Sequence, residues 1–374
     1  MQPKQIADQP TAAQQYNQIA IQTSEALEAA RTPAKPTETS AAKAPPTIEQ
    51  LFPINRAGLG VAKEYEAMGN RPVSESLQST ADAAGVTFEH LGVTVGTVLH
   101  GIDLKTPLPD AMIQLIRNTL LERKVIFFRD QNLNEDQQVG FARRFGELDA
   151  FPFGKHGDNP YILEIAHDEN RPGRENGSHT DVTWMERPSL GSIAQCVEVP
   201  PIGGDTLFAD SHAAYHGLAP ELTARLQHLH GVHDYRVFLA GGGSMRLSDE
   251  LIASIKEDIP FGVSHPLLRT HPETGKTALY LHGGFLRHDS LFDVRTGEPL
   301  DAQESQEIVE LLLAQHPRAE YSCRFAWEPG SMAFWDNRAV QHYAASDYYP
   351  HRRVLRRVTV SGDKPFYDPE AVRP

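Results

Sequence analysis

Three residues of the chain could hold a metal ion. His179 and Asp181 stand two positions apart in the segment SHTDVTW, and His342 follows far downstream in WDNRAVQHY. Residues i and i+2 of a strand point to the same face, so the first imidazole and the carboxylate would converge. Two histidines and one carboxylate are the facial ligand set of non-haem iron(II) sites, and this set leaves coordination positions open for reactants. Because an isolated HxD is common by chance, the prediction depends on what surrounds His342.

An arginine-rich segment, HRRVLRRVTV, follows His342 and has the period-two pattern of a strand. One face would carry Arg353, Leu355, Arg357 and Thr359, and the other face Val354, Arg356, Val358 and Val360. The valines suit packing against helices or a second sheet. Two guanidinium groups side by side repel each other unless anions neutralise them, so the first face predicts carboxylate or sulfo-group ligands. A solvated basic edge is the alternative interpretation.

A pair of glycines in the segment PPIGGDTLFAD precedes another expected strand. Gly203 and Gly204 predict a tight turn, after which Thr206 would open the strand with a hydroxyl donor. Taken alone, this pattern indicates only a hairpin.

The motifs HTD, GGDTLF, HPLLRTHPETGK, WDNRAVQHY, RRVLRR and GDKPFY follow one another in a recognisable order. Over residues 86–368 their order and spacing resemble the taurine dioxygenase (TauD/TfdA) family of iron(II)/2-oxoglutarate enzymes. The resemblance implies a mainly β protein with flanking helices, built on a double-stranded β-helix core (jelly roll, cupin-like). It also implies an oxidoreductase that binds iron(II) and uses 2-oxoglutarate and O2 as cosubstrates.

The same resemblance assigns the site residues. His179, Asp181 and His342 match the metal ligands and hence the catalytic centre. Thr206 and Arg353 match the residues that bind the carboxylates of 2-oxoglutarate. A guanidinium suits that second role, because it offers a planar fork of donors to a carboxylate.

Substrate-binding positions depart from the taurine pattern. Arg357 matches the position that meets the sulfonate, but Phe151 and Gly154 stand where taurine enzymes carry a His and a Tyr. Ser178 stands where a bulky aromatic residue commonly precedes the metal-binding His. The pocket is therefore expected to be roomier and more apolar. We expect a small anionic organic substrate, a sulfonate or an alkyl sulfate ester, to be hydroxylated at a C–H bond, giving succinate, CO2, an aldehyde and a released anion.

Three alternatives remain open at this point. The same chemistry could act on an aryloxyalkanoate or another carboxylate. A zinc-dependent hydrolase could use the same three ligands, but no general base is evident and Arg353 would be unexplained. A non-catalytic barrel would not need the triad together with Arg353. Oxygen-dependent formation of succinate would separate the dioxygenase from the last two alternatives.

Other histidines and a tryptophan have more ordinary expectations. His265 and His271 are expected to pack or to form hydrogen bonds rather than to bind metal. His282 and His288 flank GGFLR and are expected in a surface loop, with a place in the pocket as the alternative. Trp335 is expected in the core near the cosubstrate.

Local patterns predict how these residues are positioned. Helices are expected at 110–124, with Asp110 as a candidate cap, and at 134–148, 220–228 and 301–315. The apolar run KVIFFRD predicts a buried strand, and short strands between Gly, Pro and Asp turns are expected at 160–167, 189–199, 205–209, 277–282 and 320–360. Many short strands with a few covering helices favour a β-sandwich or jelly roll.

Composition divides the 374 residues into three parts. Residues 1–48 predict a disordered or weakly helical extension, because they contain too few large apolar side chains to bury. Residues 49–85 are expected to be a linker or a docking segment, and 86–368 the catalytic domain. The two cysteines, Cys196 and Cys323, are far apart in the sequence and are expected to be reduced thiols.

Charge and hydropathy limit the partners. The net charge of −14 argues against nucleic acid, which requires a basic surface. No apolar run is long enough for a membrane span, and the N-terminal segment lacks the pattern of a secretory signal. We therefore expect a cytoplasmic enzyme with no membrane partner. The family resemblance implies a homo-oligomer, either a dimer or a tetramer.

Overall fold

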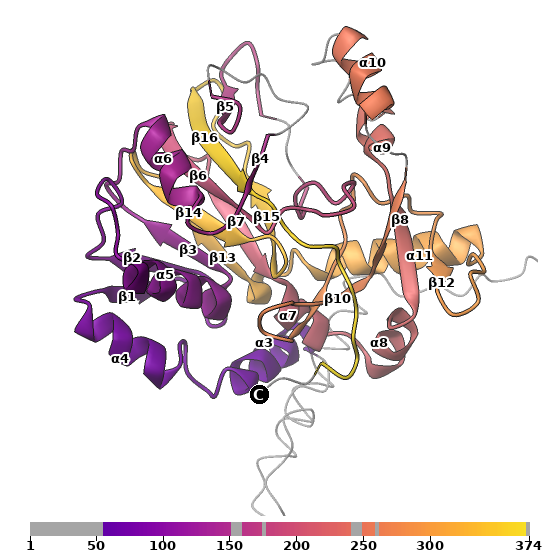
Figure 1. Cartoon of the computed structure of the whole chain (residues 1–374). Helices are drawn as coiled ribbons and strands as arrows, with labels where there is room; N and C mark the ends of the chain where they lie inside the picture. Colours follow the sequence, from indigo (N-terminus) through magenta and orange to yellow (C-terminus); the bar gives the residue numbers. More distant parts are fainter. Residues whose placement is uncertain (1–54, 151–158, 174–176, 241–248, 259–261, 372–374) are drawn as a thin grey trace, which may run out of the picture. The chain divides into compact units, whose positions relative to one another are not determined.

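Antiparallel strands form the centre of the fold, and helices lie around them (Figure 1). The computed structural model describes residues 55–150, 159–173, 177–240, 249–258 and 262–371. The expected extension at 1–48 lies outside the described residues. The main sheet has the order β1 (Thr87–His90), β2 (Thr97–His100), β3 (Val125–Phe128), β14 (Met332–Asp336), β6 (Gly191–Glu198), β16 (Arg353–Val360) and β4 (Leu148–Asp149), and β5 (Leu163–His167) also pairs with β16.

A second sheet packs against one face of the main sheet. It has the order β13 (Ser322–Phe325), β7 (Thr206–Asp210) and β15 (Val340–Ala344). Two smaller sheets complete the fold, one of β12 (Phe292–Asp293), β8 (Leu229–His233) and β9 (Val263–Pro266), and one of β10 (Leu268–Thr270) and β11 (Thr277–Leu279). The arrangement confirms the expected mainly β fold with a jelly-roll core.

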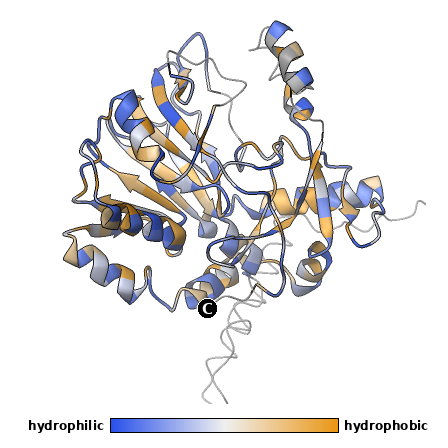
Figure 2. Cartoon of the chain, in the orientation of Figure 1, coloured by the Kyte–Doolittle hydropathy of each residue, from blue (hydrophilic) through white to orange (hydrophobic). Residues whose placement is uncertain are grey.

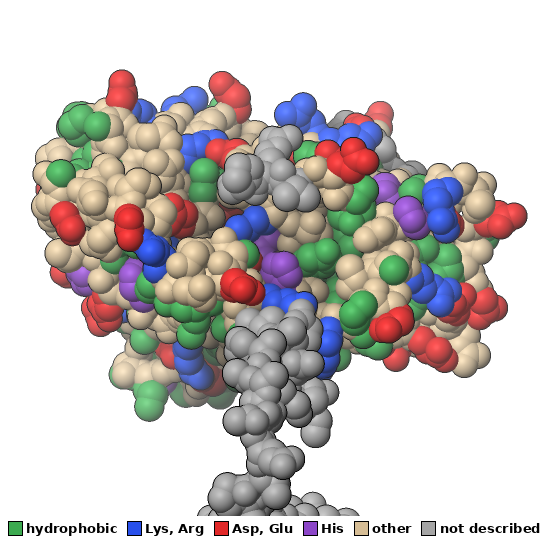
Figure 3. All heavy atoms as spheres, turned by 90° about the horizontal axis from the view of Figure 1, so that it is seen from below, with side chains coloured by type: hydrophobic (Ala, Val, Ile, Leu, Met, Phe, Trp, Pro, Cys, Tyr) green, Lys and Arg blue, Asp and Glu red, His purple; other side chains and the backbone are tan. Residues whose placement is uncertain are grey.

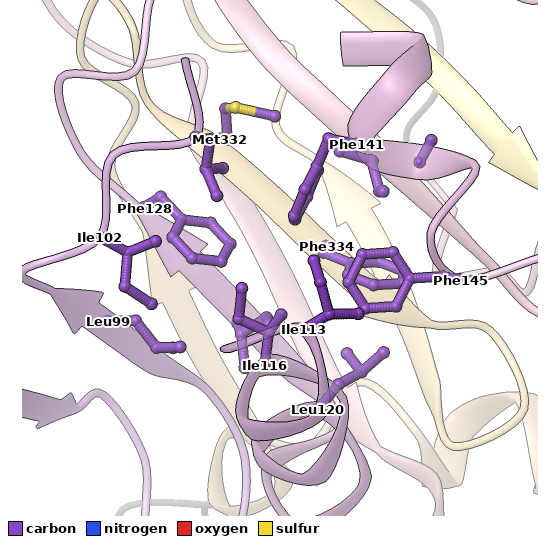
Figure 4. Close-up of a cluster of buried hydrophobic side chains, with 14 of the residues drawn as sticks. Leu99, Ile102, Ile113, Ile116, Leu120, Phe128, Phe141, Phe145, Met332 and Phe334 are labelled. Carbon is purple, nitrogen blue, oxygen red and sulfur yellow. The ribbon is translucent and has the colours of Figure 1, made fainter. Parts of the chain in front are cut away.

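Alternating residues of the main sheet face two different cores. On one face, Phe128 and Phe334 pack with residues of the helices α5 (Asp110–Arg123) and α6 (Glu135–Ala142), as Figure 4 shows. On the other face, Phe127 and Trp335 pack against Phe208 of the second sheet. Because both faces are buried, strands β3 and β14 are almost wholly apolar, and β3 is visible as orange ribbon in Figure 2.

Strand β16 follows the predicted alternation. Val358 and Val360 lie in the core on the helix side, whereas Leu355 lies between the two sheets. Arg353 and Arg357 share the side of Leu355, and all three line a cavity. The pattern of the sequence therefore predicted correctly which face of this strand looks into the cavity.

Helix boundaries agree with most expectations, with two corrections. The helix expected at 134–148 ends at Ala142, and Leu148 already belongs to β4. Pro109 is the residue that caps α5, so Asp110 is the first residue of the helix and not its cap. Asn134 caps α6 and forms a reciprocal capping box with Gln137, which explains the sharp start of that helix. The other helices are α3 (Arg56–Ala67), α4 (Glu75–Ala83), α7 (Ser211–His216), α8 (Pro220–Leu226), α9 (Tyr235–Ala240), α10 (Asp249–Asp258), α11 (Ala302–Gln315) and the 3-10 turn η2 (Ala319–Tyr321).

Helix α3 packs against α7 and is joined to the β core by buried charges. The Glu64 carboxylate accepts a hydrogen bond from the Lys124 ammonium at 2.8 Å, and the same ammonium donates to Asp210 at 2.9 Å. All three side chains are almost completely buried. The described part of the segment 49–85 thus contributes to the folded core.

The surface carries charges of both signs, and the two cysteines are buried. On the face drawn in Figure 3, acidic and basic side chains are interspersed over the described residues. Within the described ranges, no helix is long and apolar enough to cross a membrane. Cys196 and Cys323 are both free and buried, as expected for reduced core thiols.

Candidate metal and cosubstrate site

A single β-bridge brings the two histidines of the predicted triad together. The backbone N–H of His179 donates to the carbonyl of His342 at 3.0 Å, and the N–H of His342 donates back at 2.8 Å. Directly opposed residues of an antiparallel pair place their side chains on the same side. The two imidazole rings accordingly lie 4.2 Å apart between centroids. The fold therefore joins two segments that are remote in the sequence.

Asp181 reaches the same point from a turn rather than from a strand. Only His179 of the HTD motif forms a bridge, and Asp181 begins the turn that follows, so the expectation of a strand through both residues was wrong. The buried Asn337 side chain accepts the N–H of Asp181 at 2.9 Å and donates to its carbonyl at 3.0 Å. This clamp fixes the backbone where the strand geometry ends. Val182 next to it has a left-handed φ of 48°, a strained conformation for a β-branched residue.

The three side chains form a compact ligand set. One ligand atom from each of His179, Asp181 and His342 lies within 4.8 Å of the other two. The Nε2 atom of His179 is 3.7 Å from Asp181 Oδ1, and Nε2 of His342 is 3.9 Å from the same oxygen. The Nδ1–H of His179 donates to the carbonyl of Gly177 at 2.9 Å, which directs Nε2 towards the common centre.

Protonation states in the triad suit a metal ion. Burial, reinforced by the neighbouring His179, lowers the pKa of His342 to about 3, which keeps this imidazole neutral. Burial alone would raise the pKa of Asp181, but the Arg357 guanidinium and the two imidazoles hold it well below its usual range. A neutral imidazole and an ionised carboxylate are the forms that coordinate a divalent cation. The residues therefore fit a metal.

Arg357 contacts the triad directly. Its Nη1 donates to both oxygens of the Asp181 carboxylate at 3.2 Å, and Ser192 Oγ donates to Oδ2 at 3.2 Å. The sequence placed Arg357 beside Arg353 on one strand face but gave no indication of this ion pair with Asp181. The partner was missed because Asp181 comes from a turn that no periodic pattern describes.

A second polar group lies in the same cavity, around Thr206. The hydroxyl of Thr206 accepts from Arg353 Nη2 at 3.4 Å and from the indole Nε1 of Trp327 at 2.9 Å. Thr206 and His342 lie on adjacent strands, with Ala344 opposite Thr206. The cavity is lined by Ile165, His167, His179, Ala194, Thr206, Phe208, Trp327, Trp335, His342, Ala344, Ala345, Ser346, Tyr348, Arg353, Leu355 and Arg357. Trp335 lies where the sequence predicted, whereas Trp327 was missed.

Comparison with known proteins identifies the family. The family model "Taurine catabolism dioxygenase TauD, TfdA family" matches residues 87–359. An alpha-ketoglutarate-dependent sulfate ester dioxygenase of Pseudomonas putida is 34% identical over 72% of this chain and 88% of its own length. An alkylsulfatase of Acinetobacter baylyi is 33% identical over 72% and 83%. A taurine dioxygenase crystal structure from Burkholderia xenovorans has a TM-score of 0.63 and 33% identity, covering 77% of this chain and 94% of that one.

The chain belongs to the TauD/TfdA dioxygenase family. It is accordingly a 2-oxoglutarate-dependent dioxygenase, an oxidoreductase, as the sequence motifs predicted.

Two remaining substrate predictions have different outcomes in this TauD/TfdA member. Phe151 lies outside the described residues, so its predicted place in the pocket stays a prediction. Ser178 is half-buried next to His179, but it is not among the described residues that line the cavity. The Nε2–H of His265 donates to the carbonyl of Thr183 at 2.8 Å, and His271 pairs with Asp336 at 3.0 Å, which confirms that both have structural contacts.

His282 departs from its expected place in a surface loop. Its ring is half-buried and lies 5.2 Å from the ring of His179 and 4.2 Å from that of Phe285. Phe285 packs in a core cluster with Val182 and Trp184, so the loop is drawn inwards beside the HTD motif. The alternative expectation, that His282 lines the pocket, is not met by the described cavity lining, which does not include His282.

Proposed function

We propose that His179, Asp181 and His342 hold iron(II) and that the enzyme hydroxylates an alkyl sulfate ester or sulfonate. The observation that carries the proposal is the convergence of these three ligand atoms beside the pair formed by Thr206 and Arg353. Three protein ligands leave the metal room to bind a chelating 2-oxo acid and O2. When bound, the iron would supply the oxidising chemistry that couples decarboxylation of 2-oxoglutarate to attack on a C–H bond.

The protein's own part is to bind and orient the cosubstrate. A buried guanidinium can donate two parallel hydrogen bonds to the distal carboxylate of 2-oxoglutarate, which suits Arg353. Thr206 accepts hydrogen bonds from Trp327 and Arg353, so its O–H is the group that it offers to a ligand oxygen. Trp327, Phe208 and Trp335 give this end of the cavity apolar walls that exclude water.

Arg357 is proposed to bind the anionic group of the primary substrate. Its guanidinium carries N–H donors in a planar fork, more than one carboxylate can accept, so the contact with Asp181 is compatible with a second anion. The names of two relatives, an alkylsulfatase and a sulfate ester dioxygenase, favour a sulfate ester as that anion. Hydroxylation of the carbon bonded to the ester oxygen would give an unstable adduct that separates into an aldehyde and hydrogen sulfate.

An oxygen-electrode and product assay tests this function. The iron-loaded enzyme is given 2-oxoglutarate and hexyl sulfate in air, and succinate, hexanal and inorganic sulfate are measured. We expect equimolar products that disappear when O2 is removed. Hexanesulfonate and phenoxyacetate are assayed in parallel. If phenoxyacetate alone is turned over, the substrate class is an aryloxyalkanoate and not a sulfate ester or sulfonate. Release of sulfate without O2 would instead indicate a metal hydrolase.

The assembly and location of the enzyme remain proposals of the same kind. We infer from the family resemblance a homodimer or homotetramer working in the cytoplasm. Light scattering on the purified full chain measures the mass directly, and a value near 41.5 kDa would show a monomer instead.

A further inference from the structure

His282 has a polar side chain beside the triad, and the proposed function gives this residue no role. The centroid of its ring lies 5.2 Å from that of His179, whose own ring lies 4.2 Å from that of His342. His282 is not part of the group of ligand atoms within 4.8 Å of one another among the described residues. The ring is therefore a neighbour of the predicted metal position rather than a fourth member of the ligand set.

The loop around His282 fixes which ring nitrogen carries the proton. The Nδ1 atom accepts hydrogen bonds from the backbone N–H of Gly284 at 2.8 Å and of Phe285 at 3.2 Å. A nitrogen that accepts cannot carry a proton, so the proton of this imidazole is on Nε2. The loop thus orients the ring and leaves an Nε2–H donor on the edge that is not bound to the loop.

The position of His282 separates it from the proposed cosubstrate pocket. His179 and His342 line the cavity that contains Thr206 and Arg353, but His282 does not. Thr206 and Arg353, the proposed cosubstrate ligands, line that cavity together with Arg357, which contacts the triad through Asp181. A donor beside His179 that does not line this cavity is suited to the ligand that Arg357 also meets, rather than to 2-oxoglutarate. The ligand proposed for Arg357 is the anionic primary substrate.

We propose that His282 is a substrate-binding and specificity-determining residue, whose Nε2–H donates a hydrogen bond to an oxygen of the substrate's anionic group beside His179. The proposal deepens the proposed function and depends on it for the class of substrate. Arg357 approaches the triad through Asp181 and His282 approaches it through His179, so the two would hold the anion from two directions.

Two substitutions separate the donor from the loop contacts. In His282→Asn, the side-chain oxygen can still accept the N–H of the residue two positions on, as in an Asx turn, but the Nε2–H is lost. In His282→Gln, an amide N–H2 stands near the former Nε2, while the acceptor for Gly284 is lost. His230→Asn, in strand β8 and in ring contact with Phe292, is the matched control for replacing a half-buried histidine.

Binding is measured anaerobically, through the visible charge-transfer band of the iron(II)–2-oxoglutarate enzyme and its perturbation by substrate. Hexyl sulfate, hexanesulfonate and phenoxyacetate are titrated, and the tightest ligand of the wild type is used for all variants. We expect the dissociation constant of that ligand to rise about tenfold in His282→Asn, the effect of one hydrogen bond to a charged group. His282→Gln and His230→Asn should stay within about twofold of the wild type on the same scale.

Further readouts distinguish the possible failures. Iron content and 2-oxoglutarate affinity should be unchanged in His282→Asn, and more succinate should form per substrate oxidised. Unchanged binding of the anion in His282→Asn would overturn the proposal, and so would a parallel loss of iron, which would make His282 a metal ligand. If the wild type forms no charge-transfer band at all, the proposed function fails first, and the His282 proposal falls with it.

Discussion

Two groups of buried charges in the molecule differ in how their polar atoms are paired. Around Lys124, the ammonium donates to Glu64, Asp210 and the carbonyl of Thr94, so each of its three N–H groups has a partner. Around Asp181, by contrast, two imidazole nitrogens and a carboxylate oxygen are directed at one another without a hydrogen bond between them. In the first group every N–H of the cation has a partner, whereas the second group is arranged to receive a cation.

This difference separates residues that hold the fold from residues that perform chemistry. A saturated buried ion pair becomes costly when one partner is removed, because the other charge stays buried. A set of converging ligands contributes little to folding without its metal and is expected to tolerate substitution structurally. Substitution of one group at a time should therefore change either stability or activity.

The largest effect is expected from a metal ligand. His179→Ala should abolish both iron binding and turnover, because it removes one of the three ligands that converge among the described residues. Its half-buried position means that the urea midpoint should hardly change. Iron content after anaerobic loading and succinate formation are the measurements. Full activity in this variant would refute the assignment of the triad.

The reverse result is expected at Lys124. Lys124→Met removes the ammonium that Glu64 and Asp210 share and leaves Glu64 only the Lys276 ammonium at 2.8 Å, so the free energy of unfolding should fall by about 3–5 kcal/mol. The variant that still folds should bind iron and 2-oxoglutarate as the wild type does. Lys364→Met removes an exposed pair with Glu186 and serves as the control, with little change expected. A stable but inactive Lys124→Met would contradict the distinction between the two groups.

A smaller, reciprocal pair of effects is expected within the active site. Arg357→Ala should raise the KM of the primary substrate about tenfold or more and affect that of 2-oxoglutarate much less. Arg353→Ala should do the opposite, because Arg353 lies beside Thr206. Steady-state kinetics with each reactant varied in turn measure both constants. Equal losses in either variant would mean that its ligand had been assigned wrongly.

The smallest effect concerns pH and the group around Lys124. Burial would raise the pKa of Glu64, but Lys124 and neighbouring groups hold it well below its ordinary value of 4.5. A depressed pKa stabilises the fold above 4.5, and this contribution is lost as the pH falls through the folded-state pKa. In Lys124→Met we expect burial to outweigh the Lys276 ammonium that still pairs with Glu64, so that the pKa of Glu64 rises above 4.5 and acid relieves the buried charge. The difference in unfolding free energy between the two proteins should therefore shrink from pH 7 to about pH 4.5. If the difference in unfolding free energy stays constant with pH, the titration of Glu64 does not contribute to it.

The sequence allowed the strands and one face of the site to be predicted. Period-two alternation in HRRVLRRVTV identified the sides of Arg353 and Arg357 correctly, because both faces of β16 are buried and a slip of one residue would bury the wrong set. The metal ligands could be named because their residue types and the surrounding motifs are distinctive. In the structure their side chains converge on one point.

Other parts of the site could not be predicted, because they depend on contacts between loops. Asp181 lies in a turn fixed by Asn337, and Trp327 approaches Thr206 from a different strand connection. His282 reaches the triad because Phe285 is buried beside Trp184, a contact that no local pattern records. Periodicity describes regular elements, whereas these contacts arise only when the elements are packed.

The most direct test of the central claim is to add iron(II) and 2-oxoglutarate to the protein without O2 and to record its visible spectrum. Chelation of iron by a 2-oxo acid at a site with three protein ligands should produce a weak charge-transfer band in the wild type. The band should be absent in His179→Ala and should require more 2-oxoglutarate in Arg353→Ala. Iron that binds to the wild type without forming the band would contradict the account, because the cosubstrate would then not bind where Thr206 and Arg353 are proposed to hold it.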